Sequence, residues 1–345
     1  MKRRELFGAA CVLGSASLLA HAQKASAAAP DPLKPQRLRK GDAVTVVAPA
    51  RVGYERIELE YAGDILRALG LEPRFGGNIG KRFGYLAGLD AERAHDINQA
   101  FADPAIKGVF AMRGGWGSGR LLPLLDYRAM TDNPKILLGY SDITALLLAA
   151  YRRSGLVGVH GPNILSDWNP FVVDLLQRLL FEGEEIEYRP QRPQTDSLAT
   201  LEGRIQTLVP GSARGRLIGG NLTVLAALVG TPYLPQLDGC LLFLEDVHEP
   251  VYRIDRALTQ LRLAGLLERA NGIIFGAFRD IPLETGYGDF ALYEVLEQHC
   301  QAVGKPAFLG ASFGHLAQNS PLPLGVEARM DAASGVIRLL EAAVR

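Results

Sequence analysis

The sequence is poor in cysteine, in excess charge and in aromatic side chains. Its 345 residues contain only 3 Cys, which excludes a small fold held together by several disulfides. The 37 basic and 37 acidic side chains cancel, and there are only 2 Trp, 11 Tyr and 13 Phe. No basic surface field is therefore expected to hold phosphates, and nucleic acid is excluded as a partner. What is present is 48% hydrophobic residues, enough for two cores in a globular protein.

Residues 1–29 are predicted to be an export signal that does not belong to the fold. Arginines at positions 3 and 4 precede the apolar stretch 6–20, about 15 residues, whereas a membrane-spanning helix needs roughly 20. The small residues at 25–29 (Ala-Ser-Ala-Ala-Ala) offer a cleavage site, although an uncleaved anchor is the alternative. We expect twin-arginine export, a soluble periplasmic protein without a stable membrane anchor, and no essential disulfide between the remaining Cys240 and Cys300.

The mature chain alternates strand-like apolar runs with helical repeats. In its first half, strands are expected at 44–48, 107–112, 136–138 and 156–159, and helices at 56–69, 121–125 and 143–153. We predict an α/β fold in which an N-terminal domain, 35–185, has a parallel sheet with flanking helices. A linker is predicted at 186–215, where prolines and polar residues interrupt the pattern. A smaller C-terminal α/β domain, 216–345, is predicted from helices at 222–229, 254–267 and 290–301 and strands at 241–244, 272–278, 324–328 and 336–340.

The clearest local signal is a strand that runs through a Gly-x-Ser turn directly into a helix. It covers residues 135–146, with Gly139 and Ser141 at the turn. Such a turn exposes a serine hydroxyl at the edge of the sheet, close to a helix N-terminus that stabilises negative charge. Ile143 stands where a nucleophile elbow has its second glycine, so a Ser or Asp helix N-cap remains an equal alternative.

A glycine-rich loop, residues 112–120, also lies between a predicted strand and a predicted helix. Its backbone N–H groups are suited to an oxyanion or a phosphate. The loop has neither the Lys-Ser/Thr ending of a P-loop nor the Gly-x-Gly-x-x-Gly spacing of a dinucleotide site, which argues against a nucleotide cofactor.

Two more polar positions follow apolar runs in the second half of the chain. Glu245 ends the run 240–244, and His315 lies in a polar loop that ends at Pro321. Glu245 is either a site residue or a solvated strand end, and a lone loop histidine needs a partner before it has a role. His248 and Glu249, which follow soon after Glu245, lack the His-Glu-x-x-His spacing of a zinc site, and we predict no metal and no cofactor. Serine, donor loop, carboxylate and imidazole are the four parts of acyl transfer through an activated serine.

Six motifs in this order give the sequence its resemblance to the L,D-carboxypeptidases. They are Arg-Gly-Gly-Trp-Gly at 113–117, Gly-Tyr-Ser-Asp-Ile-Thr at 139–144, Gly-Gly-Asn-Leu at 219–222, Leu-Glu-Asp at 244–246, Tyr-Arg-Ile-Asp-Arg at 252–256 and Gly-His at 314–315. The chain thus resembles, from about residue 38 to 340, the serine peptidase family of murein tetrapeptide carboxypeptidase and the microcin C self-immunity hydrolase. Trp116, where Tyr is more usual, is a mild departure.

The resemblance implies a role for five residues of this chain. Ser141 is implied as the nucleophile, His315 as the general base and then acid, and Glu245 as the carboxylate that orients the imidazole. The backbone N–H groups of Gly115 and Asp142 are implied as the oxyanion donors. Members of the family are commonly homodimers, so the resemblance also implies a homodimer for this chain.

The implied reaction is hydrolysis of the bond between the L-centre of meso-diaminopimelate, or L-Lys, and a terminal D-Ala in peptidoglycan tetrapeptides. Arg113 and Arg253 are candidates for binding the terminal carboxylate, although either can instead hold a loop through an ion pair. Two other functions remain open. One is a microcin-type acyl-adenylate hydrolase with the same triad, and the other is a non-catalytic periplasmic protein that binds wall peptides or solutes.

Overall fold

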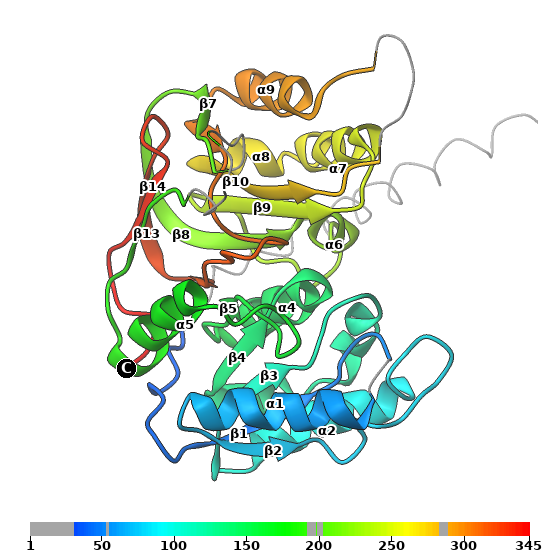
Figure 1. Cartoon of the computed structure of the whole chain (residues 1–345). Coiled ribbons are helices and arrows are strands. Elements are labelled where there is room, and N and C mark those ends of the chain that lie inside the picture. The colour runs from blue at the N-terminus through cyan, green and yellow to red at the C-terminus, as the bar shows by residue number, and fades with distance from the viewer. Residues whose placement is uncertain (1–30, 53–54, 192–197, 199–202, 283–288) are drawn as a thin grey trace, which may run out of the picture.

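The described part of the chain forms two β-sheets that lie in separate layers, with helices packed on both (Figure 1). This computed structural model describes residues 31–52, 55–191, 198, 203–282 and 289–345. The predicted export signal at 1–29 lies outside these residues. Within them, no helix is long and apolar enough to cross a membrane.

The first sheet has six strands in the order β12-β5-β4-β3-β1-β2. All neighbours are parallel except β12 and β5. Every residue of β1 and β4 is buried, as expected for a parallel sheet covered on both faces. The strands are β1 (Ala43–Val47), β2 (Glu72–Phe75), β3 (Ile106–Ala111), β4 (Ile136–Gly139), β5 (Val159–His160) and β12 (Leu322–Pro323). The helices are α1 (Arg56–Ala68), α2 (Asp90–Ala102), η1 (Ser118–Leu124), α3 (Tyr127–Asp132), η2 (Ser141–Ile143), α4 (Thr144–Ser154), α5 (Pro170–Gln177) and η3 (Arg178–Glu182).

The second sheet has eight strands in the order β6-β14-β13-β8-β9-β10-β11-β7. The inner strands from β8 to β11 are parallel, whereas the strands outside them pair antiparallel. The strands are β6 (Glu187–Tyr188), β7 (Gln206–Val209), β8 (Ser212–Asn221), β9 (Leu241–Val247), β10 (Gly272–Arg279), β11 (Ala307–Leu309), β13 (Glu327–Asp331) and β14 (Val336–Leu339). The helices are α6 (Leu222–Ala227), α7 (Val251–Leu263), α8 (Leu266–Arg269) and α9 (Leu292–Val303). The α/β fold class with two sheets is confirmed.

The stretch 186–215, predicted as a linker, carries edge strands of the second sheet. It contains β6, β7 and the beginning of β8. Tyr188 of β6 pairs with Ile337 of β14, and Val209 of β7 pairs with Ala307 of β11. These strands are stabilised by partners about 100 to 150 residues further along the chain, so their own polar sequence gives little local signal.

β12 and α4 both contribute contacts that join the layers. β12 comes from the C-terminal part of the chain but adds an edge strand to the first sheet, next to β5. α4 lies between the sheets (Figure 1), and its Thr144 hydroxyl accepts the backbone N–H of Asn221 at the end of β8, at 3.0 Å. The buried apolar side chains form one cluster that extends through both layers. Groups at the ends of β4, β5 and β9 therefore meet between the two sheets.

Candidate active site

Ser141 lies in the sharp turn between β4 and α4, in a backbone conformation that is rare for a residue with a side chain. Its φ is 65°, in the left-handed region. Neither η2 nor α4 begins with a side-chain cap, and the carboxylate of Asp142 instead accepts the N–H of Ser118 at 2.8 Å. The geometry is therefore that of a nucleophile elbow and not that of a Ser or Asp N-cap.

Two glycines allow the close packing around the turn: Gly139, which precedes it, and Gly114 of the glycine-rich loop. A Cβ on Gly114 would lie 2.9 Å from the Cβ of Ser141, and a Cβ on Gly139 would lie 2.8 Å from Oδ1 of Asn163. The Asn163 amide also holds the backbone of Tyr140, accepting from its N–H at 3.3 Å and donating to its carbonyl at 3.4 Å. The serine is thus fixed by its own backbone and by the loop that follows β5.

The glycine-rich loop lies directly against this elbow. The Ser118 hydroxyl donates to the carbonyl of Asp142, which together with the bond to the Asp142 carboxylate locks the loop to the turn. Gly115 has φ 113°, and a Cβ there would lie 2.6 Å from the Cβ of Arg51. In the described residues, no loop or turn hydrogen bond uses the N–H of Gly115 or Asp142. Both predicted donors therefore remain able to bind an oxyanion.

A pocket of about 220 Å³ includes Ser141 in its wall. Its lining combines loop glycines, two arginines and residues from the elbow and the loop after β5: Arg51, Arg113, Gly114, Gly115, Tyr140, Ser141, Asn163, Leu165 and Ser166. Hydroxyl, backbone donors and cationic side chains thus share one small cavity. Such a cavity suits the carbonyl and the carboxylate of an anionic ligand.

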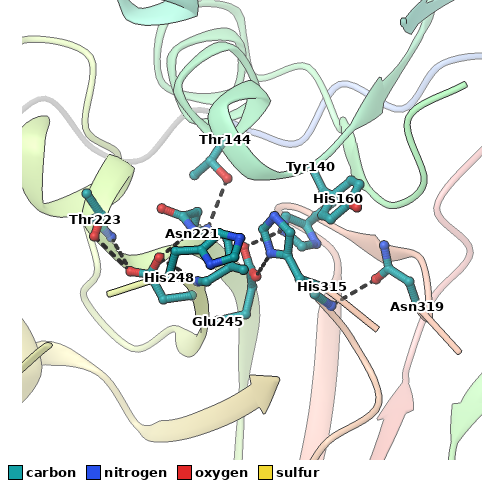
Figure 2. A network of polar contacts seen from close by, with 12 residues as sticks. Tyr140, Thr144, His160, Asn221, Thr223, Glu245, His248, His315 and Asn319 are labelled. Atoms are coloured by element: carbon teal, nitrogen blue, oxygen red, sulfur yellow. Dashed lines mark hydrogen bonds and ion pairs between the residues drawn. The ribbon is translucent and has the colours of Figure 1, made fainter. Parts of the chain in front are cut away.

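The second sheet brings Glu245 and His315 together. Glu245 lies on β9 and is fully buried, and its Oε2 is 2.6 Å from Nδ1 of His315 in the loop after β11 (Figure 2). Gly314 makes this approach possible, because a Cβ at this position would lie 2.7 Å from the Cβ of Glu245. Asn319 accepts the Gly314 N–H at 2.9 Å and so fixes the loop. With Nδ1 bonded to Glu245, Nε2 is the nitrogen left for proton transfer.

The charges in this pair stabilise one another. Burial raises the pKa of Glu245, but the imidazoles of His160 and His315 outweigh it and lower that pKa to about 2. Burial likewise lowers the pKa of His315, but the hydrogen bond to Glu245 and its charge raise it above the usual value. Glu245 is therefore ionised at neutral pH and can stabilise a protonated imidazole.

The elbow that carries Ser141 comes close to His315 through Tyr140, the residue before the serine. The ring of Tyr140, next to Ser141, lies 4.9 Å from the imidazole of His315, and Figure 2 shows both beside Glu245. In the described residues, the Ser141 hydroxyl makes no hydrogen bond to His315. Catalytic hydrogen bonds are often long in ligand-free enzymes and shorten when the substrate binds.

Asp246 follows Glu245 on β9 but has a different role. It accepts hydrogen bonds from the side-chain amide of Asn221 at 2.9 Å and from the N–H and hydroxyl of Thr223 at 3.0 and 2.8 Å. Burial, together with the charge of Glu245, raises its pKa to about 6. Asp246 therefore ties the end of β8 and the beginning of α6 to β9.

The two candidate arginines lie in different places. Arg113 lines the Ser141 pocket, and its guanidinium is 3.5 Å from the carboxylate of Glu58 on α1. The side chain of Arg253, on α7, is 56% exposed, lies 3.6 Å from Glu249, and is absent from the pocket lining. The structure thus places Arg113, and not Arg253, in a cavity with the serine.

Three polar residues of this region were not predicted from the sequence. Arg51 lines the pocket, Asn163 braces the elbow, and His160 lies beside Glu245. Each lies at or shortly after the end of a strand without a distinctive spacing, so only the folded sheet brings it to the site. Among the described residues, no group of three or more His, Cys, Asp or Glu side chains is placed to hold a metal ion, and Cys240 and Cys300 are buried free thiols.

Both halves of the chain match one peptidase family. Residues 44–161 match the LD-carboxypeptidase N-terminal domain, and residues 214–330 match the LD-carboxypeptidase C-terminal domain. The probable murein peptide carboxypeptidase of Bacillus subtilis is 37% identical over 305 residues, which cover 87% of this chain and 92% of that protein. The microcin C7 self-immunity protein MccF of Escherichia coli is 30% identical over 291 residues, 78% of this chain and 83% of that one.

A solved structure supports the same relationship. The crystal structure of muramoyltetrapeptide carboxypeptidase from Oxalobacter formigenes superposes with a TM-score of 0.74 at 28% identity. The match covers 86% of this chain and 97% of that one, so the similarity extends through both sheets.

Proposed function

The chain belongs to the LD-carboxypeptidase family, and from that premise we propose that it is a serine peptidase that removes the terminal D-Ala from peptidoglycan tetrapeptides. The bond cut is the amide between the L-centre of meso-diaminopimelate, or of L-Lys, and D-Ala. Relatives named as murein peptide and muramoyltetrapeptide carboxypeptidases support this substrate class.

One observation carries the proposal: the Glu245–His315 pair, bonded at 2.6 Å, lies at the boundary where the strained Ser141 emerges from the other sheet. A buried carboxylate behind an imidazole and a serine in a nucleophile elbow are the parts of a Ser-His-Glu triad. A protein that only binds wall peptides needs neither the strained serine nor the buried ion pair.

The first chemical step forms an acyl-enzyme. The Ser141 hydroxyl attacks the carbonyl carbon of the scissile amide while Nε2 of His315 takes the hydroxyl proton. The N–H groups of Gly115 and Asp142 stabilise the resulting oxyanion, each contributing roughly 3 kcal/mol to lowering the barrier. Collapse of the intermediate breaks the C–N bond, and the imidazolium returns its proton to the amine of D-Ala as it leaves.

The second step restores the enzyme with the same groups. A water molecule gives a proton to Nε2 of His315 and attacks the acyl carbon, and the same backbone N–H groups stabilise the second oxyanion. Ser141 leaves with the proton from His315, and the product is the tripeptide acid. Glu245 stays ionised throughout and keeps the imidazole in the correct tautomer.

An exopeptidase also has to bind the free terminal carboxylate. Arg113 and Arg51 share the pocket with Ser141, and a planar guanidinium pairs well with a carboxylate. We assign this role to Arg113, with Arg51 beside Gly115 in the same pocket lining. Arg253 is not assigned to the pocket, because it is an exposed residue of α7 outside the lining.

The second candidate function is hydrolysis of an acyl-adenylate of the microcin type, which the similarity to MccF favours. The triad is the same in both functions, and the two differ in the leaving group, which is a nucleotide in one and D-Ala in the other. Twin-arginine export of residues 1–29 and a periplasmic location, which we also propose, favour wall peptides. A homodimer stays a prediction.

The deciding experiment is mass spectrometry of the products formed from purified disaccharide tetrapeptides. The wild-type protein is expected to yield the tripeptide and free D-Ala, whereas Ser141→Ala lowers the rate by at least about 10,000-fold while ligand binding persists. The matched control is Ser154→Ala at the other end of α4, whose hydroxyl donates to the carbonyl of Ala150 and accepts the N–H of Leu156, both outside the Ser141 pocket.

Equal turnover by Ser141→Ala would rule out serine catalysis. A wild-type protein that leaves the tetrapeptide intact but hydrolyses an aminoacyl sulfamoyl adenosine would favour the second candidate. Cell fractionation with and without the two arginines at positions 3 and 4 tests the export proposal independently of activity.

A further inference from the structure

A second histidine, His160, lies beside the carboxylate of Glu245. It belongs to the first sheet, whereas His315 lies in the loop after β11 of the second sheet. Nε2 of His160 is 3.8 Å from Oε1 of Glu245, and both side chains are completely buried. In the described residues, Oε1 of Glu245 and both ring nitrogens of His160 have no hydrogen-bond partner. Buried polar atoms are rarely left so, because an unsatisfied group costs about 1–3 kcal/mol.

The ring of His160 is fixed by the elements around it. His160 ends β5, where its backbone pairs with Gly139 of β4 and with Leu322 of β12. Its imidazole makes edge-on contacts with Phe243 at 5.6 Å and with Phe313 at 6.3 Å. The strand that carries His160 is therefore the neighbour of the strand that leads to Ser141.

Aromatic rings cover this imidazole on several sides, and Tyr140 completes the enclosure at 5.9 Å. The titratable groups that face His160 are Tyr140 from the elbow and Glu245 from β9. His315 also lies against Tyr140 and is bonded to the other carboxylate oxygen of Glu245 (Figure 2). The free carboxylate oxygen of Glu245 is thus the acceptor toward which a proton on Nε2 of His160 is directed.

We propose that His160 is a positioning residue of the triad, which donates its Nε2–H to Oε1 of Glu245 when substrate is bound. A movement of about 1 Å brings the 3.8 Å contact within hydrogen-bond distance. This inference rests on the proposed serine mechanism. Glu245 is then held by two imidazoles, one from each half of the structure. The side chains contact one another in the order Ser141, His315, Glu245, His160.

The second hydrogen bond has a mechanical consequence. With Oε2 bonded to His315 alone, the carboxylate can rotate about its last torsion and carry the imidazole with it. A donor on Oε1 fixes the plane of the carboxylate, and therefore the direction in which Nε2 of His315 points. Because His160 belongs to the sheet that carries Ser141, it also fixes the distance between the nucleophile and its base.

The test compares four residues at position 160 with kinetics on the tetrapeptide. The side-chain amide of Gln places an N–H near the position of Nε2, that of Asn places it near Nδ1, and Met fills the volume without a donor. We expect kcat of His160→Met and His160→Asn to fall by about 10- to 100-fold, because a displacement below about 1 Å has effects of this size. His160→Gln is expected to retain most of the activity. KM should change little, because His160 does not line the pocket.

A second readout needs no substrate and separates this proposal from the proposed function. The pKa of His315 is measured by NMR titration of its imidazole proton, assigned by its loss in His315→Gln. Without a donor on Oε1, Glu245 becomes a stronger acceptor, so His160→Met should raise the pKa of His315 and His160→Gln should not. A wild-type protein that fails to release D-Ala refutes the proposed function but leaves this shift to be observed.

Two results would overturn the proposal. One is a folded His160→Met protein with wild-type kcat and an unchanged His315 titration. The other is an equal loss of kcat in the Met, Asn and Gln variants, together with a raised KM and a lower melting temperature. This result is expected if His160 only fills space.

Discussion

The six-stranded sheet holds its part of the site with backbone geometry, whereas the eight-stranded sheet holds its part with buried side chains. Ser141 is fixed by a left-handed turn and by glycines that allow close packing. His315 is fixed by its bond to Glu245, a carboxylate with no exposed surface. The first arrangement is sensitive to added volume, and the second is sensitive to loss of charge. Substitutions of each kind therefore distinguish the two halves of the site.

The largest effect within this comparison is expected for Glu245→Gln. The amide keeps the shape of the side chain but removes the charge, and it favours the wrong imidazole tautomer, so kcat should fall by about 1,000- to 10,000-fold. The matched control is Asp246→Asn, the next residue on β9, which should stay within a few-fold of wild-type turnover because it bonds to Asn221 and Thr223. Wild-type rates for Glu245→Gln would reduce Glu245 to a structural carboxylate.

The same pair of variants separates two pH dependences of the unfolding free energy. The pKa of Glu245 is lowered to about 2, so its stabilisation is present above its ordinary pKa and is lost as pH falls toward 2. The pKa of Asp246 is raised to about 6, so its contribution is greatest below its ordinary pKa and declines as pH rises through 6. Urea unfolding between pH 3 and 7 should show Glu245→Gln removing the first dependence and Asp246→Asn the second.

A smaller loss is expected when volume is added on the nucleophile side. Gly115→Ala strains a φ of 113° and places a Cβ 2.6 Å from the Cβ of Arg51, so the backbone N–H must turn away from the oxyanion. Loss of one such donor lowers kcat by about 100- to 1,000-fold. Gly119→Ala is the matched control in the next segment, because its Cβ meets only the Cβ of Ala145, at 4.0 Å. Equal activity of the two variants would exclude Gly115 as an oxyanion donor.

This difference between the two halves also decides what the sequence reveals. The elbow and the glycine loop are local, so the strand, glycines and helix around Ser141 could be predicted from a dozen consecutive residues. The bond between Glu245 and His315 joins positions 70 residues apart, and only the family resemblance paired them. His160 gave no signal at all, because a histidine at the end of a two-residue strand has no periodicity to mark it.

The edge strands of the fold show the same limit on what can be predicted from the sequence. The prolines and polar residues of 186–215 predicted a linker, yet β6 and β7 pair there with β14 and β11. β1, β3 and β4 of the first sheet were predicted because they are largely buried and alternate with helices. The edge strand β2, which is mostly exposed, was not predicted. Burial in the centre of a sheet leaves a signal in the sequence, whereas pairing at its edge depends on a distant partner.

The smallest effect within this comparison is expected from the arginines, and it bears on binding more than on chemistry. Arg113→Gln should lower kcat/KM about 10- to 100-fold, mainly through KM, because a charge-assisted bond to the terminal carboxylate is lost. Arg253→Gln should stay within about two-fold, since its guanidinium lies beside Glu249 on the exposed side of α7. A substrate with an amidated C-terminus provides the control, because it cannot form the ion pair and should be equally poor for wild type and Arg113→Gln. If Arg113→Gln lowers kcat/KM equally for the free acid and for the amide, Arg113 supports the loop through Glu58. Recognition of the carboxylate would then have to be sought at Arg51.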